Sequence, residues 1–124
     1  MACARTSDNS SRIAGLLKEE IDWKRVVRMA HKHHVSSLVY WNLNRQPGAN
    51  VPDEAMAQMR KESQYIAGRN LFLVGELLTL LKRFENGGIR AIPFKGPMLA
   101  AGVYRNMALR CCGDLDLLIE ENDA

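Results

Sequence analysis

The sequence predicts an α+β fold, with an α/β-like order of elements in its last third. Up to about residue 86, apolar residues recur at helical spacing, interrupted only by short turn segments. After Gly88 the pattern changes to short apolar runs typical of strands, separated by a glycine-containing turn. The change divides the chain into a helical N-terminal region, residues 1–86, and a strand-containing region, residues 87–124.

Four helices are predicted in the N-terminal region. Ser10 or Ser11 can cap the first and Asp22 the second, because short polar side chains accept hydrogen bonds from the free N–H groups of a helix start. The third begins at Ser36 or Ser37. The second helix carries one apolar stripe, formed by Trp23, Val26, Val27, Ala30 and His34.

The fourth predicted helix is much longer. It opens at Pro52-Asp53 and ends before Gly87-Gly88, since glycine commonly follows a helix C-terminus. At 1.5 Å per residue it would be on the order of 50 Å long, so we expect a kink near Gly68 or Gly75. Its apolar positions keep near-helical spacing: Met56, Met59, Ile66, Leu73, Leu77, Leu81 and Phe84.

Beyond the long helix, the sequence predicts a strand, a tight turn, a helix and a second strand. Residues 89–94 are apolar and favour a strand, and Pro93 places it at a sheet edge or near its own end. Lys95-Gly96-Pro97 forms the turn. Proline is favourable just inside a helix start, so a helix is expected from Pro97 to about Tyr104.

The second strand begins with two carboxylates, Asp114 and Asp116. On an extended strand, residues i and i+2 share a face, so both side chains point the same way. Two such carboxylates repel one another unless a cation or proton lies between them, and Mg²⁺ takes oxygen ligands while leaving room for substrate phosphates. The apolar run Leu117-Leu118-Ile119 favours this interpretation over a surface turn whose carboxylates face water.

Gly96 offers a second feature of phosphate chemistry. Glycine between a strand and a helix lets backbone approach a phosphate, and the helix start contributes free N–H groups and the positive end of its dipole. Lys95 adds a mobile cation. The alternative is a plain strand-to-helix turn that needs glycine for its backbone angles.

Together these elements resemble the nucleotidyltransferase superfamily that includes DNA polymerase beta, and more closely a bacterial family of uncharacterised nucleotidyltransferases. The resemblance depends mainly on residues 89–119, with the Lys95-Gly96 turn, Arg110 and the Asp114-Leu115-Asp116 motif. The helices before residue 89 also look like the N-terminal region of that family. The resemblance implies an N-terminal helical bundle whose long helix leads into a partial mixed β-sheet, the start of a catalytic core at 87–124.

The same resemblance implies transfer of a nucleoside monophosphate from a nucleoside triphosphate to an unknown acceptor: a small molecule, a protein or RNA. Asp114 and Asp116 would be the catalytic carboxylates and the ligands of Mg²⁺ or Mn²⁺. Gly96 would lie beneath the triphosphate, and Lys95 and Arg110 would contact phosphates or, for Arg110, clamp the aspartates.

The chain departs from the wider superfamily in two respects. Pro97 stands where Ser or Gly usually follows the glycine, and the third metal-site carboxylate of the superfamily comes from a later strand. Glu120, Glu121 and Asp123 are too close to the pair to replace it, so we expect a truncated N-terminal portion of an enzyme. A second hypothesis stays open: a non-catalytic, degenerate module of this fold that binds a nucleotide or a protein.

Composition is compatible with either hypothesis. The formal charge of +3 suits a phosphate-bearing ligand without requiring nucleic acid. No apolar run approaches the roughly 20 residues that a membrane span needs. Three cysteines, two of them adjacent, form no disulfide framework, so a reduced, cytoplasmic setting is expected.

Other polar residues are interpreted structurally. His31 and His34 are helix neighbours, but no nearby acidic or cysteine partner completes a set of metal ligands, so we expect them to be satisfied by hydrogen bonds or to face solvent rather than bind metal. Arg69, like other basic residues of the long helix, is assigned to a solvated face. Cys111-Cys112 is expected to pack in the strand.

Overall fold

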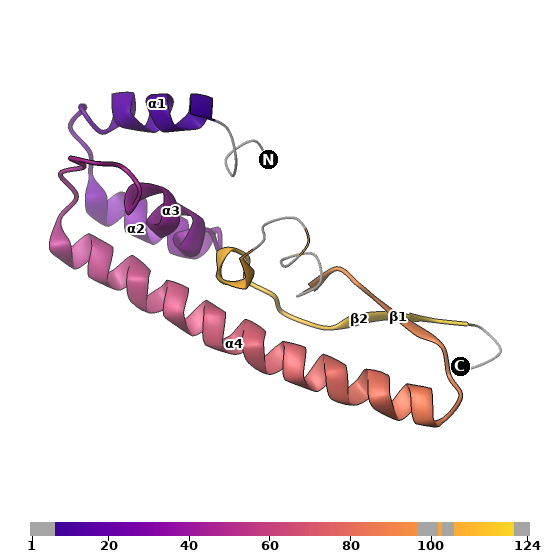
Figure 1. The fold of residues 1–124 in the computed structure, drawn as a ribbon. Helices are drawn as coiled ribbons and strands as arrows, with labels where there is room; N and C mark the ends of the chain where they lie inside the picture. Colours follow the sequence, from indigo (N-terminus) through magenta and orange to yellow (C-terminus); the bar gives the residue numbers. More distant parts are fainter. Residues whose placement is uncertain (1–6, 97–101, 103–105, 121–124) are drawn as a thin grey trace. The chain divides into compact units, whose positions relative to one another are not determined.

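A computed structural model describes residues 7–96, 102 and 106–120 of the 124-residue chain. These residues form four α-helices and a two-stranded sheet (Figure 1), which confirms the α+β prediction. The chain divides into two compact units, Met1–Tyr65 and Ile66–Ala124. The domain boundary predicted between residues 86 and 87 stays a prediction.

The first unit consists of three short helices and the start of a long one. Helix α1 spans Ser7–Leu16, α2 spans Trp23–Lys32, α3 spans Ser36–Leu43, and the long helix α4 spans Asp53–Asn86. The core of this unit is formed by Val27, Leu43, Ala55 and Met59, with Trp23 and Tyr40 packed against it. The predicted helical bundle is therefore present, and Met59 belongs to its core.

The ends of α1 and α2 partly differ from the prediction. The cap at Asp22 is confirmed, since its Oδ1 accepts a hydrogen bond of 3.0 Å from the N–H of Arg25. The caps at Ser10 and Ser11 are wrong, because α1 begins at Ser7 and both serines lie inside it. His34 does not extend the stripe of α2, because the helix ends at Lys32.

His34 instead occupies the left-handed position of a Schellman motif. Its φ is 56°, its N–H donates to the His31 carbonyl at 3.0 Å, and the N–H of Val35 donates to the Ala30 carbonyl at 2.9 Å. Because a side chain in this conformation costs energy that glycine avoids, we expect His34→Gly to raise the free energy of unfolding by about 1 kcal/mol in urea denaturation.

The matched control is His33→Gly, one residue earlier. His33 has a φ of −95°, which side chains adopt readily, so glycine there can only add freedom to the unfolded chain. We expect this variant to be neutral or less stable. Equal shifts for the two variants would contradict the assignment of strain to His34.

Helix α4 runs without interruption through Gly68 and Gly75, and the predicted kink stays a prediction. Its predicted end at Gly87-Gly88 is confirmed by a second Schellman motif. The N–H of Ile89 donates to the Phe84 carbonyl at 2.9 Å, and Gly88 has a φ of 74°. No helix in the described part of the chain has both the length and the apolar character needed to cross a bilayer.

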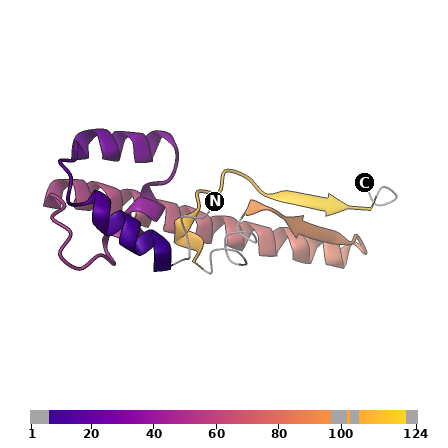
Figure 2. The ribbon, with the colours of Figure 1, turned by 90° about the horizontal axis from the view of Figure 1, so that it is seen from above.

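The second unit contains the last part of α4 and the strands β1 (Ala91–Phe94) and β2 (Asp116–Ile119). The strands are antiparallel and lie side by side (Figure 2), with Ile92 opposite Leu118 and Phe94 opposite Asp116. Within the described residues β1 has a single neighbouring strand, which agrees with the edge position predicted from Pro93.

Part of the predicted chain course lies outside the described residues. The helix expected from Pro97 to about Tyr104 falls there except for Gly102, and so do Glu121 and Asp123. All five predicted site residues, by contrast, are described: Lys95, Gly96, Arg110, Asp114 and Asp116.

Candidate functional site

The turn after β1 lies against the segment that precedes β2. Lys95 and Gly96 have left-handed φ angles of 62° and 51°. A Cβ atom added to Gly96 would lie 3.1 Å from the carbonyl oxygen of Asp114, tighter than ordinary van der Waals contact. The glycine therefore permits a close approach to the backbone of Asp114, whereas the predicted approach to a phosphate stays a prediction.

The Lys95 ammonium lies between a carboxylate and an aromatic ring. Its Nζ is 4.0 Å from Oδ2 of Asp116 and 4.6 Å from the centroid of the Phe94 ring. The strand register explains this placement, because Phe94 pairs with Asp116 and Lys95 follows directly. The Lys95 side chain is 57% exposed, so its pairing with Asp116 is weak and the ammonium is accessible to an anion from solution.

The two carboxylates are held differently. Asp116 is the first residue of β2, and its side chain is 35% exposed. Asp114 lies two residues before the strand and is exposed. The prediction that one strand holds both residues is therefore wrong for Asp114, because the ladder with β1 begins only at Asp116. No third His, Cys, Asp or Glu groups with the pair within the described residues.

Helix α4 holds the segment that leads to Asp114. The side chain of Asn70 is fully buried; its Nδ2 donates to the Arg110 carbonyl at 2.7 Å and its Oδ1 accepts from the N–H of Cys112 at 3.3 Å. One residue earlier, Nη2 of Arg69 donates to the carbonyl of Gly113 at 3.3 Å. Arg69 is exposed, as its assignment to a solvated face expects, but its side chain also binds the segment before Asp114.

The sequence pattern did not identify Asn70 as a residue that binds another segment, although its position on the helix gave one indication. It lies one helical turn after Ile66 and two turns before Leu77, and all three residues are buried. A polar residue on the buried stripe of a helix requires hydrogen-bond partners. Such a residue could have been marked as one that binds another segment of the chain.

Arg110 is bound through its backbone carbonyl by Asn70, and one nitrogen of its side chain lacks a partner among the described residues. Its Nη1 is buried and has no hydrogen-bond partner among the described residues. No ion pair joins it to Asp114 or Asp116 in this part of the chain, so the predicted clamp on the aspartates is not seen. A buried guanidinium nitrogen without a partner is costly, and an anionic ligand such as a phosphate would satisfy it.

The two adjacent cysteines differ in environment. Cys112 is 3% exposed, whereas Cys111 is partly exposed. Neither lies in a strand, so the prediction of strand packing is wrong, although Cys112 is packed. Burial raises the pKa of the Cys112 thiol, and the nearby Arg110 guanidinium opposes this shift without cancelling it.

This difference predicts unequal reactivity. At about neutral pH, we expect N-ethylmaleimide to modify Cys111 at least about tenfold faster than Cys112. The reagent reacts with the thiolate, and the thiolate must be accessible to it. Tandem mass spectrometry can place the adduct on either residue, with Cys111→Ser and Cys112→Ser as controls. Equal rates in the two single variants would contradict the buried placement of Cys112.

His31 has an acidic partner that the sequence pattern did not reveal. Its Nδ1 lies 3.0 Å from Oε1 of Glu62, which α4 supplies. His31 is therefore hydrogen-bonded, and its side chain is also 71% exposed, which agrees with the expected satisfied or solvent-facing histidine. Two groups do not make a metal site, and no cluster of three metal-binding side chains occurs in the described ranges.

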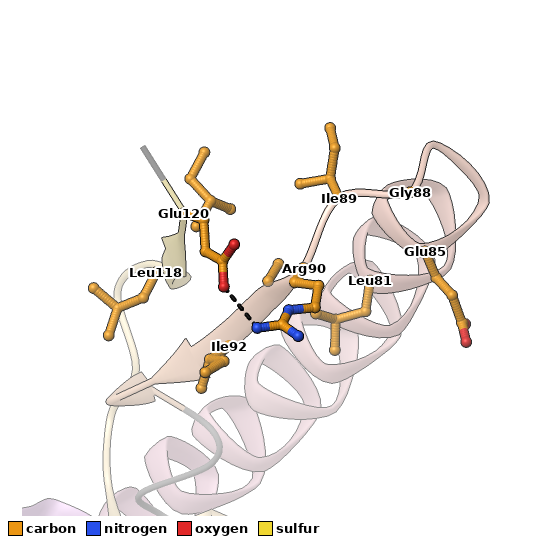
Figure 3. A pocket seen from close by; sticks show the side chains of 10 residues that line it. Leu81, Glu85, Gly88, Ile89, Arg90, Ile92, Leu118 and Glu120 are labelled. Atoms are coloured by element: carbon orange, nitrogen blue, oxygen red, sulfur yellow. Dashed lines mark hydrogen bonds and ion pairs between the residues drawn. The ribbon is translucent and has the colours of Figure 1, made fainter. Parts of the chain in front are cut away.

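A cavity of about 810 Å³ lies beside the strands at the end remote in register from Asp116 and Lys95. Its walls include Leu81, Ile92 and Leu118, and an ion pair of 2.7 Å joins Arg90 to Glu120 there (Figure 3). None of the predicted site residues lines it. Glu120 thus pairs with Arg90, the residue directly before β1, and does not group with the two aspartates among the described residues.

Comparison with known proteins agrees with the resemblance carried by the Lys-Gly turn and the aspartate pair. The profile of a family described as uncharacterised nucleotidyltransferase matches residues 19–124, all but the first 18 residues of the chain. Neither the curated proteins nor the solved structures gave a match. The matched range includes the turn, both aspartates and the segment bound by Asn70. The chain therefore belongs to the uncharacterised nucleotidyltransferase family.

Proposed function

We propose that this chain provides a metal- and nucleotide-binding site for transfer of a nucleoside monophosphate from a nucleoside triphosphate to an acceptor. Family membership supports the general kind of reaction. At the level of residues, the proposal depends on one observation: the Lys95-Gly96 turn contacts the segment that carries Asp114 and Asp116. Membership of the polymerase beta superfamily and a bacterial origin stay predictions.

The side chains present fit a hard divalent cation. Asp114 and Asp116 offer carboxylate oxygens two residues apart, and both side chains are accessible. Such oxygens are the preferred ligands of Mg²⁺ and suit Mn²⁺ as well. When bound, the ion would supply Lewis-acid stabilisation of the charge that develops on the transferred phosphate.

Two cationic groups would bind the phosphates. Lys95 carries an accessible ammonium beside Asp116, and Arg110 has a buried nitrogen that lacks a partner among the described residues. Gly96 keeps the lysine-bearing turn close to Asp114. Positioning and electrostatic stabilisation account for most of the catalysis in phosphoryl-type transfers, so cationic groups beside the carboxylates support the proposal. No catalytic base is assigned, since no third acidic residue groups with the pair in the described part of the chain.

The test uses nucleoside triphosphates labelled with ³²P at either the α- or the γ-phosphate. The full chain is incubated with Mg²⁺ and a panel of hydroxyl-bearing small molecules, proteins and RNA. We expect Mg²⁺-dependent transfer of the α-label and no transfer of the γ-label. Nucleotide binding without transfer would favour the non-catalytic module. Absence of both transfer and Mg²⁺-dependent nucleotide binding would contradict the proposal.

A further inference from the structure

We propose that Asn70 is a positioning residue, which fixes the segment before β2 and thereby places Asp114 relative to Asp116. The inference rests on the proposed function, because it concerns the ligands of the cation in that site. Asn70 itself touches neither carboxylate in the contacts described above. Its role would be exerted through the backbone of residues 110–113.

The identity of residue 70 is explained by these contacts and not by packing. The position is fully buried on the face of α4 that also carries Ile66 and Leu77. An apolar side chain would pack there without a desolvation cost, whereas a buried carboxamide is unfavourable unless its donor and acceptor are both bonded. The described hydrogen bonds satisfy both kinds of group, and both lead to the segment before Asp114.

The geometry of the carboxamide suits this role. Its donor and acceptor lie on the same planar group, so bonds to the Arg110 carbonyl at 2.7 Å and the Cys112 N–H at 3.3 Å fix the spacing and direction of the backbone between them. Arg69 extends the contact to the carbonyl of Gly113, the residue directly before Asp114.

The segment needs such a contact because the sheet does not order it. Residues 111–115 belong to no helix or strand, and the pairing of β2 with β1 begins at Asp116. Asp114 therefore lies between two anchored residues: Cys112, which Asn70 binds, and Asp116, which pairs with β1. Loss of the Asn70 bonds would leave Asp116 in place and loosen Asp114, since the exposed contact of Arg69 with Gly113 would remain on that side. The binding of a cation by both aspartates would then be weakened.

The experiment compares Asn70→Ala with Ile66→Ala, a buried residue on the same face of α4 whose side chain makes no hydrogen bond. Mn²⁺ affinity is measured by electron paramagnetic resonance, and amide exchange at residues 112–114 by hydrogen–deuterium exchange. We expect Asn70→Ala to raise the Mn²⁺ dissociation constant at least about tenfold and to accelerate exchange, while Ile66→Ala stays within about twofold for affinity.

A variant at the surface tests the same contact in case Asn70→Ala does not fold. Arg69→Ala removes only the contact with Gly113 from an exposed side chain, and Arg60→Ala removes the same charge from another exposed position of α4. Arg69→Ala should accelerate exchange at residues 113 and 114, and Arg60→Ala should not. Unchanged exchange in the folded Asn70 or Arg69 variant, or an equal loss of Mn²⁺ affinity in Ile66→Ala, would overturn the inference.

The two proposals fail in different ways. If the wild-type chain binds no Mn²⁺, the proposed function is contradicted, and the exchange data alone decide the positioning role. Faster exchange in Asn70→Ala but not in Ile66→Ala then supports it, and identical exchange in both overturns it.

Discussion

Replacement of both Asp114 and Asp116 by asparagine is expected to lower Mg²⁺-dependent nucleotidyl transfer at least about 100-fold, because it removes both charges that would hold the cation while preserving side-chain shape. The fold should not suffer. The only described ion pair lost is the weak, exposed contact of Asp116 with Lys95 at 4.0 Å. Rates of transfer of the α-label and thermal midpoints, measured on the same preparations, separate the two effects.

Glu120→Gln is the matched control for this result. Glu120 directly follows β2, at an even number of residues from both aspartates, as expected for a residue on the same face of an extended chain. It pairs with Arg90, however, and not with Lys95. Its replacement should change transfer less than about twofold, since an exposed ion pair contributes little. Retention of most activity by the doubly substituted protein, or an equal loss in Glu120→Gln, would contradict the assignment of the site.

Gly96→Ala is expected to weaken both the fold and the site. The new Cβ would lie 3.1 Å from the Asp114 carbonyl oxygen, and the backbone φ of 51° disfavours any side chain. We expect about 1–2 kcal/mol of lost stability from the left-handed conformation alone. Because the Asp114 segment must also move away by a few tenths of an ångström, Mn²⁺ affinity should fall as well.

Gly88→Ala separates the two causes. Gly88 has a comparable positive φ of 74°, but a Cβ there would meet nothing within 4 Å. It should therefore lose a similar amount of stability in urea denaturation without any change in Mn²⁺ affinity. If both variants bind Mn²⁺ with the affinity of the wild type, the close approach of Gly96 to Asp114 does not affect cation binding by the two carboxylates.

Much of the helical part could be predicted because its determinants are local. The cap at Asp22 and the glycines after α4 each act within one or two turns and were confirmed, and so was the burial of Val27 and Ala30 in the stripe of α2. His34 shows the limit of this reasoning. Its spacing matches the stripe, but the helix ends before it, and no local rule requires a histidine at a left-handed helix terminus.

The residues of the candidate site could be proposed from the sequence, and their role stays a prediction. The Lys95-Gly96 turn and the aspartates were proposed because their types and spacing suit phosphate and metal chemistry, whereas their arrangement could be predicted less well. The first residue of β2 is set by the end of β1, because Phe94 pairs with Asp116. Pairing between two strands is a tertiary property that local sequence does not determine. The bonds from Asn70 reach segments 40 and 42 residues away, beyond any periodic pattern.

We propose that Asp114, Asp116 and the Lys95-Gly96 turn form one metal-dependent nucleotide site. Isothermal titration calorimetry of ATP, GTP, CTP and UTP into the full chain, with Mg²⁺ or with EDTA, tests it most directly. We predict that at least one nucleotide binds in Mg²⁺, and that binding is lost in EDTA and in the doubly asparagine-substituted protein. Binding that is equal in EDTA, or unchanged by the two substitutions, would contradict the claim.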